Sequence, residues 1–271
     1  MRKYTEEEAR KASIEYFEGD ELAGTTWLKK YALRNSEGEL LELNPDMMHR
    51  RLAKEFARIE ANHPNGLGED EIYETFKGFK RIIPQGSPMY GIGNVYSPTS
   101  LSNCFVIGNE YDSYGSIALV DQQIIQLSKR RGGVGTDLSH IRPKGSIVKN
   151  AASTSTGIVP FMERYSNTLR EVGQDGRRAA GMLSISVLHP ESENFIDAKL
   201  EQTKVTGANI SVKITDDFMD AVINNKPFKH QYPVESSNPL VVVEKSASKL
   251  WKKIIYNAWK SAEPKIWDLA S

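Results

Sequence analysis

The single cysteine of this sequence is the first residue that could do chemistry. Cys104 is the only thiol among 271 residues and stands in the short apolar run CFVIG, which predicts a strand. A lone cysteine in a strand is most often inert and buried, because free cysteine behaves as a small hydrophobe. A chemical role therefore depends on what accompanies it.

Two glycine-containing basic turns follow the cysteine. The first is the bend Gly132-Gly133-Val134-Gly135, preceded by Lys129-Arg130-Arg131, and the second is the loop GQDGRR at 173–178. The first turn is not a P-loop, because no Gly-Lys-Ser/Thr follows at the required spacing. Its glycines would let the backbone lie flat against a ligand. The basic residues here and in the 142–149 segment have two interpretations, phosphate binding by arginine's planar fork or ordinary surface charge.

Several separated motifs resemble, in their order, the start of the barrel of the ribonucleotide reductase catalytic subunit. They are Ser102-Asn103-Cys104, Asp112, Gly132-Gly133, Arg142, GRRAAGML at 176–183 and KVTGANISVKITDDFM at 204–219. The resemblance covers the chain from about Ile82 onward. The stretches NCFVIG, KRRGGVG and GRRAA are most similar to the adenosylcobalamin-dependent class, and a class fed by a separate radical-generating subunit is the weaker alternative.

The resemblance implies roles for particular residues. Cys104 would be one of a catalytic redox pair. The substrate contacts would be Ser87, Ser102, Asn103, Gly132 and Gly133, with Ser87 contacting the substrate phosphates. An effector nucleotide, a dNTP or ATP, would contact Asp112, Ser113, Arg142, Lys144 and Lys149, with Asp112 accepting from its deoxyribose. A specificity loop would lie between the effector base and the substrate base and would comprise Gln174, Asp175, Gly176, Arg177 and Arg178.

The chemistry implied by the resemblance needs more sulfur than this sequence holds. In the family a thiyl radical removes the 3′ hydrogen of a ribonucleotide, the 2′ hydroxyl leaves as water, and two cysteines supply two electrons as they form a disulfide. Since Cys104 stands alone, we expect the chain to be inactive without a complementary C-terminal half. Adenosylcobalamin is expected for the complete enzyme, with no metal bound by this chain. The alternative is a non-catalytic nucleotide-binding and dimerising module that regulates a full-length reductase.

Composition limits the other function classes. The sequence has 39% hydrophobic and 26% charged residues, and its 35 Lys and Arg balance 35 Asp and Glu. The balanced net charge therefore does not point to a nucleic-acid partner. A run of about 18 apolar residues, which a membrane span requires, is absent from the sequence, and the N-terminal stretch lacks the apolar core of a secretory signal. One cysteine excludes an internal disulfide framework and fits a reducing compartment. We expect a cytoplasmic protein without a membrane partner.

The fold expected is α/β, with a helical domain over residues 1–81 and the first half of a ten-stranded α/β barrel over 82–271. Helices are predicted at 5–17, from a capping box of Thr5 and Glu8, at 45–60, from an N-cap at Asn44, and at 69–80. The cluster His49-Arg50-Arg51 is either a phosphate contact or the solvated face of a helix. We expect no separate cone domain ahead of the barrel, and so no activity switch by ATP and dATP.

Two amphipathic helices are expected between the motifs, at about 117–131 and within 150–173. Their apolar stripes suit a core, and the resemblance implies that they pack across a homodimer interface. The first helix would end at a left-handed Gly132. Strands are predicted at MLSISV, in KVTGANISVKI and at 240–244, with helices at 216–224, capped by Thr215, and at 248–261. Asn209 could approach the active site, whereas His189 receives no catalytic role.

Overall fold

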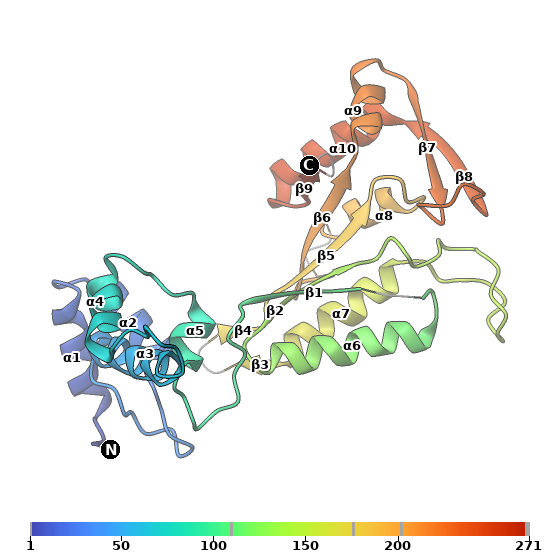
Figure 1. Ribbon diagram of the computed structural model, residues 1–271. Helices are drawn as coiled ribbons and strands as arrows, with labels where there is room; N and C mark the ends of the chain where they lie inside the picture. The colour runs from blue at the N-terminus through green and yellow to red at the C-terminus, as the bar shows by residue number, and fades with distance from the viewer. Residues whose placement is uncertain (1, 109–110, 175–176, 201–202, 269–271) are drawn as a thin grey trace. The chain divides into compact units, whose positions relative to one another are not determined.

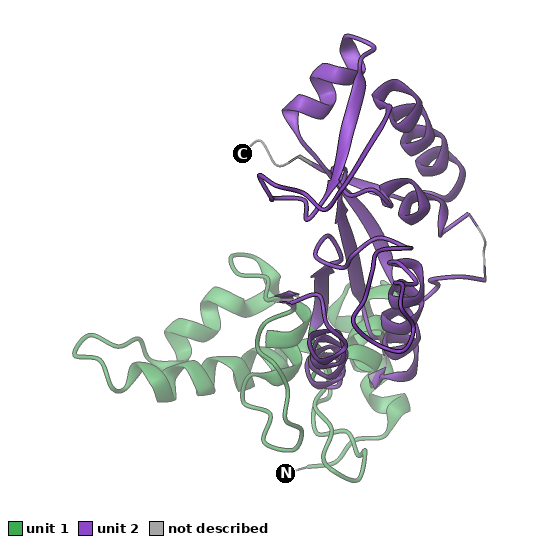
Figure 2. Cartoon of the chain, turned by 90° about the vertical axis from the view of Figure 1, so that its right-hand side faces the viewer, with its two compact units in different colours: residues 1–103, 130–132, 174–177 green, residues 104–129, 133–173, 178–271 purple. Residues whose placement is uncertain are grey.

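The computed structural model describes residues 2–108, 111–174, 177–200 and 203–268 (Figure 1). Contacts divide the chain into two compact units, which Figure 2 colours separately. Unit 1 comprises Met1–Asn103, Arg130–Gly132 and Gln174–Arg177, and unit 2 comprises Cys104–Lys129, Gly133–Gly173 and Arg178–Ser271. The boundary expected after residue 81 falls inside unit 1. The fold class expected from the sequence, helices followed by an α/β unit, is confirmed.

Unit 1 is built from helices whose starts are encoded locally. They are α1 (Glu6–Tyr16), α2 (Glu21–Lys30), α3 (Pro45–Glu60), α4 (Glu69–Phe76), the 3-10 turn η1 (Lys77–Phe79) and α5 (Gly86–Gly91). Thr5 and Glu8 form the predicted capping box of α1, and Asn44 caps α3 with Pro45 in the first turn. The helix predicted at 69–80 is shorter than expected, because Gly78 takes a left-handed φ of 65°.

The cluster at residues 49–51 belongs mostly to the packing of unit 1. His49 is fully buried with its ring 4.5 Å from that of Phe79, and burial lowers its pKa to about 4. The Arg51 guanidinium pairs with the buried Glu42 carboxylate at 2.8 Å. Arg50 alone of the three faces solvent, over the ring of Tyr73. The interpretation as a solvated helix face is therefore wrong for His49 and Arg51.

Unit 2 contains a parallel five-stranded sheet in the order β1-β2-β5-β6-β9 (Figure 1). The strands are β1 (Cys104–Gly108), β2 (Gly133–Asp137), β5 (Gly181–Ser186), β6 (Asn209–Ile214) and β9 (Lys265–Asp268). One face carries apolar side chains such as Val134, Leu183 and Ile210, which pack in one core with α6 (Tyr114–Ser128), α7 (Val159–Glu171), α8 (Ser192–Asp197) and α10 (Ala247–Ser261). Among the described residues, β1 and β9 are the edge strands of this sheet.

The remaining elements of unit 2 include a hairpin that the sequence did not suggest. They are α9 (Asp216–Ile223), β7 (Pro227–Tyr232) and β8 (Val241–Ser246). The short strands β3 (Gly173–Gln174) and β4 (Arg177–Arg178) form a small sheet of their own and are divided between the two units, because Gln174–Arg177 belong to unit 1. Thr215 caps α9 as predicted. Strand β7 pairs antiparallel with β8 from Pro227 and Ser246 to Tyr232 and Val241. The prediction of a strand at 240–244 is thereby confirmed within one or two residues.

Two details around α6 differ from the expectation. The helix ends at Ser128, and the left-handed residue after it is Arg131, with φ 71°, rather than Gly132. The segment from Gly133 is not a bend but strand β2, whose register pairs Gly133 with Cys104. Pairing with β1 and β5 on both sides overrides the local preference of glycine for turns.

Helices α6 and α7 lie side by side in unit 2 (Figure 1). The Tyr165 hydroxyl donates to the Ile117 carbonyl at 3.2 Å, and Arg164 pairs with Asp121 at 2.8 Å. The stripe that includes Ile117 is buried within the chain, whereas Tyr114 and Leu119 are exposed. Use of these helices in a dimer stays a prediction. In the described part of the chain, no helix combines the length and apolarity that crossing a membrane requires.

Candidate functional site

Cys104 is the first residue of β1 and lies on the sheet face opposite the helices. Paired residues of a parallel ladder point to the same face, so the register places Cys104 beside Gly133 at the start of this face. The next row along the strands holds Val106, Gly135 and Met182, and ends at Asn209. Cys104 is exposed, and a glycine beside it adds no side chain. The thiol is thus not the buried, inert cysteine that its type alone favours.

A polar cluster occupies the far end of the same face. The Lys213 ammonium pairs with Asp137 Oδ2 at 2.7 Å, and the hydroxyls of Ser139 and Ser184 donate to Asp137 Oδ1 at 2.8 and 3.2 Å. Four polar side chains therefore converge where β2, β5 and β6 end. The sequence analysis missed this cluster, because its members lie up to 76 residues apart and carry no motif.

A pocket of about 300 Å³ in unit 2 brings together four of the five effector residues expected from the sequence. Asp112 and Ser113 precede α6, while Arg142 and Lys149 come from the loop 142–156. The remaining walls are polar or apolar side chains from the same segments and from α7: Tyr114, Ile117, Ile141, Val148, Asn150, Ala152, Thr154, Ser155, Thr156 and Phe161. The fifth residue, Lys144, is exposed and does not line this pocket.

Electrostatics in the pocket favour an anionic ligand. Arg142 Nε bonds Asp112 Oδ2, and its Nη1 donates to the Ile147 carbonyl at 2.7 Å. Ser113 caps α6, so the positive end of this 15-residue helix dipole points at the pocket. With Lys149, the lining carries two cations against one carboxylate. A bound triphosphate would contact both the planar guanidinium group of Arg142 and the N-terminus of α6.

An aromatic wall completes the pocket. The rings of Tyr114 and Phe161 are edge-to-face, with centroids 6.1 Å apart. A nucleobase could pack on such a surface. The sequence analysis did not single out these two rings or the hydroxyls of 154–156. The Ser- and Thr-rich stretch before α7 was the available signal, and capping explained it equally well.

The loop 142–156 is held by its own pairing and by one buried carboxylate. Gly145 N donates to Ser155 O at 2.9 Å, and Ile147 bridges Thr154. Glu191, 7% exposed, accepts from the backbone N–H groups of Lys144 and Ile158 at 3.0 and 3.1 Å, both on Oε2. Glu191 thus fixes both ends of the segment that supplies Arg142 and Lys149.

Glu191→Ala is expected to destabilise the protein by about 2 kcal/mol. It removes the acceptor of the buried Ile158 N–H group, which costs about 1–3 kcal/mol, and that of the part-buried Lys144 N–H group, which costs less. Thermal or denaturant unfolding measures this loss. Glu193→Ala is the matched control, since that carboxylate is 38% exposed and pairs with the side chains of Lys245 and Lys253. Its effect is expected to stay below about 1 kcal/mol. Equal losses in the two variants would contradict the role given to Glu191.

The substrate residues expected from the sequence divide between the two units. Cys104 and Gly133 lie in unit 2, and Ser87, Ser102, Asn103 and Gly132 lie in unit 1. Ser87 is fully buried, with its hydroxyl 3.3 Å from the Arg131 carbonyl and its N–H donating to Asn103 Oδ1 at 2.7 Å. The Ser87 hydroxyl is thus engaged within unit 1 rather than open to a phosphate. A phosphate contact at Ser87 stays a prediction.

The specificity loop is only partly described. Asp175 and Gly176 lie outside the described residues. The backbone of Gln174 ends β3 and that of Arg177 and Arg178 forms β4. The role expected for this loop therefore stays a prediction.

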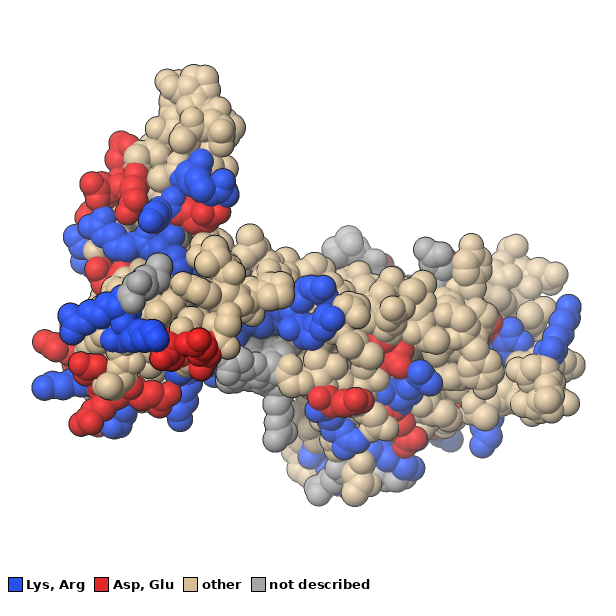
Figure 3. All heavy atoms as spheres, turned by 90° about the horizontal axis from the view of Figure 1, so that it is seen from below, with Lys and Arg blue, Asp and Glu red and all other residues tan. Residues whose placement is uncertain are grey.

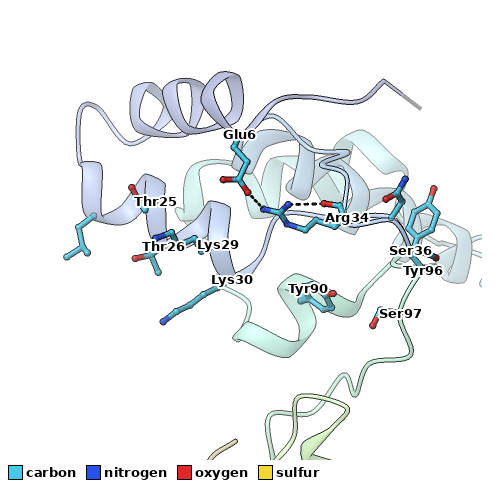
Figure 4. A pocket seen from close by; sticks show the side chains of 13 residues that line it. Glu6, Thr25, Thr26, Lys29, Lys30, Arg34, Ser36, Tyr90, Tyr96 and Ser97 are labelled. Carbon is cyan, nitrogen blue, oxygen red and sulfur yellow. Dashed lines mark hydrogen bonds and ion pairs between the residues drawn. The ribbon is translucent and has the colours of Figure 1, made fainter. Parts of the chain in front are cut away.

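Unit 1 has a larger hollow of its own, of about 900 Å³ (Figure 4). The Arg34 guanidinium there is bonded to Glu6 Oε1 and to the Gly38 carbonyl, both at 2.9 Å. Lys29 and Lys30 belong to the last turn of α2, where cations complement the dipole. None of the described residues expected to form a site lines this hollow. On the face drawn in Figure 3, basic and acidic side chains are interspersed, in keeping with the balanced charge.

Metal-ligand clusters do not occur among the described residues. No three His, Cys, Asp or Glu side chains in 2–108, 111–174, 177–200 or 203–268 gather closely enough to hold an ion. His189, one of the described residues, has a structural role. Its Nε2 lies 2.9 Å from the Ile141 carbonyl oxygen, and burial lowers its pKa.

Comparisons with known proteins identify the family of this chain. The family described as "Ribonucleotide reductase, barrel domain" matches residues 102–267. The chain is 31% identical over 209 residues to a vitamin B12-dependent ribonucleoside-diphosphate reductase of Mycobacterium tuberculosis (strain CDC 1551 / Oshkosh), covering 75% of this chain and 30% of that protein. A protein of the same description from Thermoplasma acidophilum is 35% identical over 169 residues, which are 60% of this chain and 21% of that protein.

A third relative is the ribonucleoside-diphosphate reductase NrdEB subunit alpha of Bacillus subtilis (strain 168). It is 31% identical over 174 residues, covering 62% of this chain and 16% of the relative. The chain thus spans less than a third of the length of each of these relatives. The family match covers well over half of the chain and includes both the Cys104 face and the pocket. The chain belongs to the ribonucleotide reductase family, as a large-subunit sequence whose residues 102–267 are part of the barrel domain.

Proposed function

We propose that this chain is an N-terminal part of a ribonucleotide reductase catalytic subunit, which converts ribonucleotides to deoxyribonucleotides. The observation that carries the proposal is the exposed Cys104 on the helix-free face of a parallel sheet, beside Gly133, in a chain of this family. Because Gly133 has no side chain, it leaves room for a ribose beside the Cys104 thiol. The relatives' names make ribonucleoside diphosphates the proposed substrate class. The single cysteine, which fits a reducing compartment, makes the cytoplasm the proposed location.

In the proposed reaction, one ribonucleotide and two thiols give one deoxyribonucleotide, one disulfide and one water. A thiyl radical on another polypeptide segment removes the 3′ hydrogen and later returns it. Cys104 and a partner cysteine lose one electron and one proton each as their sulfurs join, and the 2′ hydroxyl departs as water. Adenosylcobalamin is the cofactor expected for the complete enzyme. No residue of this chain is assigned to hold it.

We assign the 300 Å³ pocket to an allosteric effector, a dNTP or ATP. Asp112, Ser113, Arg142 and Lys149 support this assignment by lining one polar pocket at a helix N-terminus. Lys144 would join them only at the rim. Residues 174–178 would carry the identity of the effector to the substrate site. Helices α6 and α7 would form a homodimer interface through exposed side chains such as Tyr114 and Leu119.

Reconstitution tests the proposal. The purified chain is mixed with a polypeptide that carries the remaining barrel with its radical and redox cysteines, together with adenosylcobalamin, a dithiol and a ribonucleoside diphosphate. Deoxyribonucleotide is expected from the mixture and not from the chain alone. Turnover by the chain alone would overturn the proposal.

The second candidate is a non-catalytic nucleotide-binding and dimerising module that regulates a full-length reductase. The observation in its favour is the single cysteine, because reduction needs two thiols. Under this candidate the reconstituted mixture makes no deoxyribonucleotide, and the chain inhibits or activates an intact reductase. Recovery of turnover in the mixture would exclude it.

A further inference from the structure

The hairpin of β7 and β8 reaches the effector pocket through one tyrosine. Tyr232 ends β7, and its hydroxyl oxygen lies 2.9 Å from Asp112 Oδ2 and 2.8 Å from the His140 carbonyl oxygen. Both oxygens can only accept, so the tyrosine proton is shared between them. The residue is 120 positions away from Asp112 in the sequence. It is not itself in the pocket lining.

Tyr232 is held rigidly in this place. It is 7% exposed, and its ring packs edge-to-face against His189 with centroids 5.9 Å apart. The strand before it is fixed to the end of β5, because Gln231 N donates to Leu188 O at 2.7 Å and His230 Nδ1 lies 2.8 Å from Val187 O. The hydroxyl therefore cannot leave Asp112 without moving the hairpin.

The two partners of Asp112 share one oxygen. Arg142 and Tyr232 both reach Oδ2, and neither of these bonds occupies Oδ1. Arg142 also lines the pocket and is the group that a triphosphate would attract. If a phosphate drew the guanidinium away, the Tyr232 bond would still hold Asp112 Oδ2. Burial and the nearby Asp112 charge raise the Tyr232 pKa, so the hydroxyl stays protonated and able to donate.

We propose that Tyr232 is a positioning residue of the effector pocket, whose hydroxyl orients Asp112 so that Oδ1 accepts the 3′ hydroxyl of a bound deoxyribonucleotide. The inference rests on the proposed effector role of the pocket. It adds a residue that makes no contact with the ligand. It also gives the β7–β8 hairpin a function, since a shift of that hairpin would change the recognition of the sugar.

The test compares two ligands that differ only in the 3′ hydroxyl. The dissociation constants of dTTP and 3′-deoxythymidine triphosphate are measured by equilibrium titration of the full chain. The wild-type chain is expected to prefer dTTP. Tyr232→Phe keeps the ring but removes the hydroxyl, and we expect it to weaken dTTP binding about tenfold while leaving the 3′-deoxy analogue nearly unchanged. Tyr256→Phe, on the exposed side of α10, is the matched control and should retain the full preference.

A merely structural role would weaken both ligands equally, so an unchanged ratio between them in Tyr232→Phe overturns the inference. Failure of the wild-type chain to bind any deoxyribonucleotide overturns the proposed effector site instead. Should the variant not fold, NMR of the wild-type chain with ¹³Cζ-labelled tyrosine provides the second measurement. The Tyr232 resonance is expected to shift more with dTTP than with the 3′-deoxy analogue, and equal shifts would contradict the proposal.

Discussion

Cys104→Ser is expected to abolish deoxyribonucleotide formation by the reconstituted enzyme, a loss on the order of a thousandfold or more. A serine hydroxyl is similar in size to the thiol but cannot form a disulfide, so the two electrons of the reduction are no longer available. Nucleotide affinity of the pocket should stay unchanged, because Asp112, Arg142 and their neighbours are untouched. The measurements are turnover in the mixture and dTTP titration of the chain.

The control for Cys104→Ser lies two residues along the same strand. Val106 occupies the same face of β1 and is 87% exposed. Val106→Ala removes a side chain without touching a redox group, and it should retain most of the turnover. Substantial turnover with serine at position 104 would show that reduction uses other thiols, which would contradict the role proposed for Cys104.

Arg142→Ala is expected to weaken dTTP binding by about ten- to a hundredfold, the usual effect of losing a charge-assisted hydrogen bond. The guanidinium supplies the planar fork for the phosphates, and its loss also leaves Asp112 without its cation in the pocket. Lysine at this position restores the charge but not the fork, so Arg142→Lys should recover only part of the affinity. Equilibrium titration of each variant gives the comparison.

A matched control for Arg142 is Arg164 on α7. Arg164 also pairs with an aspartate, Asp121, but it lies outside the pocket lining. Arg164→Ala therefore removes a comparable ion pair without removing a phosphate ligand, and its dTTP affinity should equal that of the wild-type chain. Similar losses in the two arginine variants would mean that the effect is one of general stability rather than of binding.

Helix starts could be predicted from the sequence because their physics is local. Thr5 with Glu8, Asn44 with Pro45, and Thr215 each satisfy backbone N–H groups within a few residues. Apolar periodicity also predicted the helix that includes Ile117, and the apolar stripe of this helix is buried within the chain.

Strand β2 and the β7–β8 hairpin could not be predicted in the same way. Gly133 and Gly135 look like turn residues in the sequence, but β1 pairs with both of them and β5 pairs with Gly135. Strand β7 does alternate, with Phe228, His230 and Tyr232 buried. The sequence analysis passed over this pattern, because the strand begins with a proline and a histidine stands at the middle buried position. Sheet pairing is non-local, and a single sequence gives no direct signal of it.

The residues of the candidate site likewise divide into those that could be predicted from the sequence and those that could not. Asp112, Arg142 and Lys149 were available from the resemblance to the family, and the pocket they line brings the three together. Tyr232 was not, because its hydroxyl bonds Asp112 across 120 residues of sequence. Glu191 likewise acts through two backbone N–H groups, which have no sequence pattern.

Hydrogen–deuterium exchange of the full chain with and without saturating dTTP tests the central claim most directly. The proposed effector site predicts ligand-dependent protection at residues 112–117 and 147–156, the two segments that form most of the pocket. The protection should disappear in Arg142→Ala at the same nucleotide concentration. Protection confined to other segments, or none at all in a folded wild-type chain, would contradict the assignment of this pocket to a nucleotide.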